Sequence, residues 1–190
     1  MVNALNARIF GSDDDAVSIA DIGADLPDDL SELDSAFTDA GWLHSDGIEV
    51  NPDTSVEKFR GHQGGKVIRT KVTESGLTFQ FQCLESTALT LGLQMNIKDS
   101  ATDGDTTTMT VSTSNRVEPR AFVIDVYDDD GRDETVHYRY VIPRGEIGER
   151  ESFTLSNSDI TGYTFTVEVI DEYTVITNDP GVAEDEGSGV

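Results

Sequence analysis

The clearest alternation of apolar and polar residues lies near the centre of the chain, in the segment KVIRTKVTESGLTFQFQC at residues 66–83. Successive residues of a strand face opposite sides. In the second half of this segment, apolar side chains therefore alternate with uncharged polar ones: Leu77, Phe79, Phe81 and Cys83 on one side, Thr78, Gln80 and Gln82 on the other. The tripeptide ESG separates this run from a less regular one. The segment predicts a β-hairpin whose second strand faces a core.

Four further strand-like runs follow, at residues 106–111, 121–127, 135–142 and 163–170. The sequence DDDG between the middle two predicts a hairpin turn. Earlier in the chain, residues 7–10 indicate a short strand, whereas KDSATDGD at residues 98–105 is typical of a loop. Ser86 is a candidate N-cap for a short helix that would end near Gln94. Strands therefore dominate the prediction, with one or two short helices beside them.

Two stretches in the first third of the chain carry weaker signals. Four apolar residues recur at helical spacing between a proline and a glycine, which predicts a helix: Leu26, Leu30, Leu33 and Phe37. Residues 41–65 contain the turn dipeptides DG and NP and end in a glycine-rich exit. We expect them to form a long loop, and long loops in compact domains are usually functional or mobile.

The length of 190 residues fits one domain with appendages. We expect the domain to cover residues 1–176. The ending NDPGVAEDEGSGV has little to bury, so residues 177–190 predict a flexible acidic tail.

The charge balance limits the classes of function that fit this chain. It has 37 acidic and 13 basic residues, and its net charge is −24. Such a charge keeps a protein soluble and argues against wrapping nucleic acid through phosphate contacts. The N-terminus lacks the apolar run of a signal peptide, and no stretch reaches the ~18 apolar residues of a membrane span. The lone cysteine predicts no intrachain disulfide. We expect a soluble chain made inside the cell, without membrane insertion.

The residue types that perform chemistry do not form a recognisable site. The three histidines lie far apart without the spacing of zinc ligands: His44, His62 and His137. GHQGGK is followed by Val67, where a phosphate-binding loop needs Ser or Thr. The acidic run DVYDDDGRDETVH lacks a carboxylate at the first and last positions of a calcium loop, so it predicts a solvated hairpin tip. We therefore predict no catalytic residue, no cofactor and no metal, and no enzymatic activity.

One segment reverses the acidic balance. Residues 56–74 carry five cations against two acids, a local net charge of +3 beside −27 for the remainder: Lys58, Arg60, Lys66, Arg69 and Lys71 against Glu57 and Glu74. Complementary patches fix register and steer association, so we favour a basic surface that meets an acidic surface on another copy. A solvated strand face and a small DNA-binding island are the other interpretations.

Several of these stretches together resemble a known family. GWLHSDGI, a long loop, and GHQGGKVIRTKVTESGLTFQFQCLES with a short helix ending LGL resemble the major tail tube proteins of long, non-contractile-tailed phages and related tailed viruses. VIDVYDDDGRDETVHYRYVIPRGEIGE and GYTFTVEVI are similar to the second half of that family. The resemblance covers about residues 20–176 and is strongest over 61–93. The chain departs from it in its acidity, which is also typical of high-salt environments.

The resemblance implies a mainly β, sandwich- or barrel-like tail tube fold with short flanking helices. It implies hexameric rings that stack into a tube, through which double-stranded DNA passes transiently without specific binding. The implied partners are further copies of the chain, the tape measure, the tail tip and the terminator. The implied location is the virion tail, assembled in the host cytoplasm.

The resemblance and the charge pattern together suggest two surfaces. Residues 44–65 would be an inter-subunit loop, and the subunit interface would include Trp42, Lys58, Phe59, Arg60, Gln63, Lys66 and Lys71. The polar strand side would face the lumen: Thr78, Gln80 and Gln82. Two alternatives stay open, a secreted or surface calcium-binding β-sandwich adhesin and another tail component of the same fold, such as a terminator or connector.

Overall fold

The computed structural model describes residues 6–114, 116–129 and 135–182. The fold is mainly β and sandwich-like, with 52% of residues in strands and 5% in helix, as the sequence predicts. The elements are β1 (Ala16–Asp21), β2 (Thr38–Asp39), β3 (Glu49–Arg60), β4 (Val67–Cys83), α1 (Ala88–Gln94), β5 (Asn96–Asp103), β6 (Thr106–Ser112), β7 (Pro119–Asp128), β8 (Val136–Arg150), β9 (Tyr163–Val169) and β10 (Thr174–Thr177).

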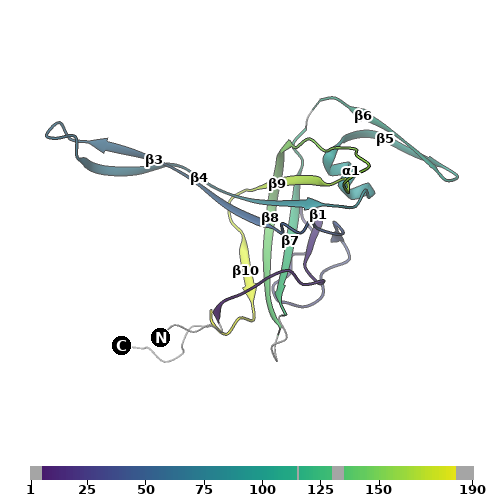
Figure 1. The fold of residues 1–190 in the computed structure, drawn as a ribbon, viewed down its shortest axis with the longest axis horizontal. Coiled ribbons are helices and arrows are strands. Elements are labelled where there is room, and N and C mark those ends of the chain that lie inside the picture. The colour runs from purple at the N-terminus through teal and green to yellow at the C-terminus, as the bar shows by residue number, and fades with distance from the viewer. Residues whose placement is uncertain (1–5, 115, 130–134, 183–190) are drawn as a thin grey trace.

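One antiparallel sheet carries most of the fold, in the order β2-β1-β7-β8-β9-β4-β3, with β10 also paired to β8. β8 is long enough to have two partners on one side: residues 138–141 pair with β10, and residues from 145 onward pair with β9. Register shifts in β7 and β8 lie near this change of partner, and bulges bend strands. The part built from β9, β4 and β3 therefore crosses over the part built from β1, β7 and β8 (Figure 1).

The core fills the space between these two parts of the sheet. Apolar side chains of β1, β7 and β8 meet those of β4 and β9: Val17, Ile19, Phe122, Ile124 and Ile142 against Phe79, Phe81, Phe165 and Val167. Phe79, Phe81 and Cys83 are buried and Leu77 packs against the cluster. The core-facing side predicted for this strand is confirmed.

The predicted hairpin within residues 66–83 is wrong. β4 runs unbroken through ESG, where Gly76 pairs with Asp53 of β3. The hairpin turn lies instead at residues 61–66, where Gly64 and Gly65 adopt positive φ angles of 71° and 63°, a conformation that glycine adopts at little cost. The partner strand is β3, so residues 49–60 of the expected loop form a strand. Pro52 is accommodated there because β3 is an edge strand.

The helix expected around residues 26–37 is also absent from that described segment, which forms turns. Asp29 and Asp34 each accept a hydrogen bond from the backbone two residues further on, at Ser31 and Ala36, and such local bonds compete with helix formation. Residues 7–10 do not form a strand, whereas β1 and β2 were not predicted.

Predictions for the middle of the chain hold with two adjustments. The short helix is confirmed, but its N-cap is Thr87 rather than Ser86, with Thr87 and Thr90 exchanging side chain to backbone bonds. Residues 98–103 of the expected soft loop belong to β5, which pairs with β6 in a separate two-stranded sheet. The other four predicted strands are confirmed as β6, β7, β8 and β9.

The beginning of the predicted acidic tail belongs to the folded domain. Thr177 ends β10, and Asp179 is buried at 6% exposure. Residues 183–190 of the predicted tail lie outside the described residues, as do the last two residues of the predicted DDDG turn.

Candidate assembly surfaces

The hairpin of β3 and β4 leaves the body of the protein as a long arm (Figure 1). Of β4, only Thr78–Cys83 pair with β9. Residues 67–77 pair with β3 alone, and at ~3.3 Å per residue this part reaches roughly 35 Å beyond the sheet. A two-stranded ribbon of this kind is at best marginally stable in water without a further surface to pack on.

Residues 66–76 are all exposed, and on β3 only Ser55 is partly buried. The exposed arm side chains include six large apolar ones: Val50, Val56, Phe59, Val67, Ile68 and Val72. Val56 and Val72 lie directly opposite each other across the two strands, so they share a face. Apolar side chains grouped on a projecting element mark an interaction surface.

The cations of the basic segment all lie on this arm. Within the described chain, no hydrogen bond or ion pair engages the side chains of Lys58, Lys66, Arg69 or Lys71. Arg60 donates to the carbonyl of Gly65 at 3.0 Å and so helps to close the tip. The other four cations make no polar contact within the described part of their own subunit.

Trp42 lies at the other end of the hairpin from the remaining predicted interface residues. Its carbonyl accepts from the backbone of Leu84 at 2.8 Å, and its own N–H donates to Glu85 at 3.0 Å. The side chain stays 69% exposed. The structure brings Lys58, Phe59, Arg60, Gln63, Lys66 and Lys71 together on the arm, and separates Trp42 from them by the length of β4.

The polar side of β4 forms the centre of an outer sheet face. Thr78, Gln80 and Gln82 pair in register with Glu168, Thr166 and Thr164 of β9. Gln80 donates to Thr166 at 3.0 Å and to Glu151 at 2.9 Å, and Gln82 donates to Thr164 at 3.1 Å. The β3 residues opposite Gln80 and Thr78 are Glu49 and Asn51. None of these paired positions is Lys or Arg, so the face is polar with negative edges.

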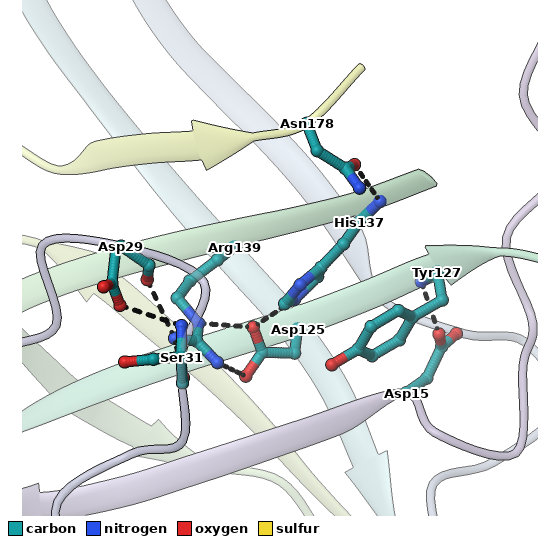
Figure 2. Close-up of polar contacts among 8 residues, drawn as sticks. All are labelled: Asp15, Asp29, Ser31, Asp125, Tyr127, His137, Arg139 and Asn178. Carbon is teal, nitrogen blue, oxygen red and sulfur yellow. Dashed lines mark hydrogen bonds and ion pairs between the residues drawn. The ribbon is translucent and has the colours of Figure 1, made fainter. Parts of the chain in front are cut away.

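A buried charge cluster lies elsewhere, on β7 and β8 (Figure 2). One oxygen of Asp125 accepts from Arg139 at 2.7 Å and contacts Nε2 of His137 at 2.6 Å. Arg139 also donates to the backbone carbonyls of Asp29 and Ser31 at 2.9 and 2.7 Å. The side chains of Asp125, His137 and Arg139 are each less than a tenth exposed. The cluster therefore tethers the 29–31 loop to the sheet.

A second cluster joins the two ends of the described chain. Arg8 forms an ion pair with Asp179 and lies 3.8 Å from Asp128. Tyr138 donates to Asp179 at 2.6 Å. The hydrogen bonds from Arg8, followed by that from Tyr138, hold the pKa of Asp179 well below its usual range. This cluster too serves the fold.

Other chemical features of the described residues are limited. They contain no group of three or more His, Cys, Asp or Glu side chains placed to hold a metal ion. Burial raises the pKa of the Cys83 thiol to about 12, which keeps it protonated and unreactive. Within the same ranges, the helix is too short to cross a membrane.

These features define a class, a β-sandwich-like domain that carries an exposed, partly basic arm and uses its buried charges to hold loops and chain ends. The family model described as phage tail tube protein matches residues 13–183. The chain belongs to that family and is a structural component of a phage tail. A search of curated proteins finds no match.

The charge pattern of the sequence indicates the basic segment that lies on the arm, but two other features of the structure were not predicted. Asp125 lies directly opposite Arg139 in the ladder, and His137 and Arg139 share a side of β8 through their spacing of two. That spacing was the available signal. The second feature is the β5–β6 hairpin, a further projection (Figure 1) on which Met109 and Val111 are exposed.

Proposed function

We propose that the chain forms hexameric rings that stack into the tail tube, the conduit through which the genome leaves the virion. The observation that carries this proposal is the arm, which exposes apolar side chains and four cations that have no polar partner within the described subunit. A second copy of the chain supplies the missing surface. Membership of the tail tube family supports the same assembly.

Ring and tube formation also accounts for the strand edges. β3 ends the main sheet, and a long exposed edge invites pairing with another chain. Closed rotational symmetry makes each such edge the neighbour of another subunit, which removes the risk of open aggregation. The interface proposed for this purpose is the arm, with Lys58, Phe59, Arg60, Gln63, Lys66 and Lys71, together with Trp42 at the hairpin's other end.

We assign the outer face centred on Thr78, Gln80 and Gln82 to the lumen. Hydroxyls and amides hydrogen-bond water without anchoring phosphate, and the flanking Glu49 and Glu168 repel it. Replacement of Gln80 by lysine should then leave tube assembly intact and slow DNA ejection at low salt, because rings of added positive charge would hold phosphates. Normal ejection rates in such tubes at low ionic strength would remove this face from the channel.

The proposed role is structural and non-enzymatic, and needs no cofactor. The partners that fit it are further copies of the chain, the tape measure, the tail tip and the terminator, in a virion assembled in the host cytoplasm. DNA passes through without specific binding, in agreement with the net charge of −24.

Negative-stain microscopy of the purified protein across a range of concentrations tests this proposal. Tubes or hexameric rings are the expected result. Persistent monomers whose melting temperature rises with calcium would support the adhesin instead, and a single closed ring that never stacks would support a terminator or connector.

A further inference from the structure

A broad groove lies at the root of the arm. Its volume is about 1150 Å³, and its walls come from the N-terminal segment, the 39–48 loop, the first residues of β3, and strands β4, β7 and β8. Side chains from three strands form an apolar floor: Phe79, Ile124 and Tyr140. Three well exposed apolar side chains stand at its rim: Phe10, Trp42 and Ile160. Such a concentration of apolar groups in a concave surface favours burial by a partner.

The rim of this groove is acidic. Five carboxylates line it: Asp13, Asp15, Asp39, Asp46 and Glu85. Among the described residues that line the groove, none is Lys or Arg. Three of the five already serve the fold, because Asp15, Asp39 and Glu85 accept backbone hydrogen bonds. Asp13 and Asp46 are exposed, and Asp46 contacts only the ring of His44 at 3.2 Å.

The tip of the arm has the complementary chemistry. It combines exposed apolar side chains, such as Phe59 and Ile68, with the free cations Lys58, Arg69 and Lys71. We propose that the arm tip of one copy of the chain docks in the acidic, apolar groove at the arm root of the next copy. This inference rests on the proposed tube and identifies the surface that receives the arm.

A subunit cannot fill its own groove in this way. Val50 of β3 lines the groove, so the groove lies at the base of the same hairpin whose tip projects away from the body (Figure 1). The contact is therefore heterologous, with different surfaces on the two partners. Heterologous contacts repeat from subunit to subunit and generate rings or helical filaments, which is the geometry that a tube requires.

Trp42 offers a direct measurement, because it is the only tryptophan in the chain and stands exposed at the groove rim. Docking would remove its indole from water. We expect its fluorescence emission to move to shorter wavelength when the protein assembles, and to be protected from acrylamide quenching. Phe59→Ala together with Ile68→Ala on the arm should weaken both changes in the assembled fraction.

Cysteine cross-linking tests the contact itself. The native Cys83 is buried, so introduced surface cysteines react selectively. Gln63→Cys at the arm tip and Ser45→Cys at the groove rim, made in separate proteins and mixed, should give a cross-linked dimer through a short bifunctional maleimide. Ser100→Cys on the exposed β5–β6 hairpin replaces Ser45→Cys as the matched control and should give no arm-specific product.

The outcomes separate this inference from the proposed function. Tubes that form with a shifted Trp42 emission and the 63–45 cross-link support the docking. The docking is overturned if tubes form while Trp42 stays solvent-exposed and the 63–45 pair gives no more cross-linked product than the 63–100 control. The proposed tube would then stand without this contact. Failure to form any ring or tube at high concentration contradicts the proposed function and the docking together.

Discussion

Charge reversal on the arm should weaken assembly without weakening the fold. The change is Lys58→Glu combined with Lys71→Glu. Both side chains are exposed and have no hydrogen bond or ion pair within the described chain. Surface substitutions of this kind usually change the unfolding free energy by less than about 0.5 kcal/mol, so the variant should melt like the parent protein.

The expected effect on assembly follows from what each charge would contact. An exposed ion pair contributes roughly 0.2–1 kcal/mol. Reversing one partner replaces that attraction by a repulsion of similar size, so two reversals should cost about 1–4 kcal/mol per subunit contact. Since about 1.4 kcal/mol corresponds to a factor of ten, the critical concentration for assembly should rise from roughly 5-fold to several hundred-fold.

Sedimentation across a concentration series measures the critical concentration, and circular dichroism verifies the fold. The matched control is Lys98→Glu, because Lys98 is the chain's fourth lysine and lies on the β5–β6 hairpin, away from the arm. The difference between variant and parent should narrow at 1 M salt, where the screening length falls to about 3 Å. An unchanged critical concentration at low salt would refute the assignment of these cations to the interface.

Three further substitutions test the fold that supports the arm. Arg139→Met leaves the Asp125 carboxylate buried without its guanidinium partner and should cost about 3–5 kcal/mol by urea denaturation, with much of the loss recovered when Asp125→Asn is added. Gly145→Ala places a Cβ within 2.5–2.8 Å of buried side chains on β7 and β9 and should lower the unfolding free energy by about 1–3 kcal/mol. The matched control is Gly148→Ala, which meets nothing within 4 Å and should be near neutral. Equal melting temperatures of the two variants would contradict this packing. Since the folded-state pKa of Asp179 is depressed, its stabilisation is present above its unfolded pKa of about 4 and lost as pH falls below it. Thermal melts below pH ~4 should therefore drop less steeply in Asp179→Asn than in the parent protein.

The sequence predicts most strands that pack a core, and burial explains why it misses β3 and β1. β4, β7 and β9 bury large side chains, so their apolar residues mark them. β3 buries almost nothing and contains Pro52, so its residues carry no periodic signal and resemble a loop. Four consecutive residues of β1 are buried, on both sides of the strand, and this removes the alternation on which the prediction depends.

The sequence also predicts part of the candidate assembly surfaces, namely the cations of the arm. The local net charge of residues 56–74 identifies these cations, because a charge count can be made without knowing the fold. The other contacts depend on the pairing register of the strands, which the sequence does not reveal. This register places Asp125 opposite Arg139, and the length of β4 separates Trp42 from the arm tip. The continuity of β4 through ESG depends on pairing with β3 over its whole length, and turn propensity does not report such pairing.

We propose that this chain builds a tube through its projecting arm. Electron cryomicroscopy of assemblies grown from the purified protein would reveal this architecture. We expect a hollow tube of stacked hexameric rings, in which the β3–β4 arm of each subunit lies against a neighbouring subunit and the Thr78, Gln80 and Gln82 face lines the channel. An assembly without a channel, or a tube in which each arm packs only on its own subunit, would contradict it.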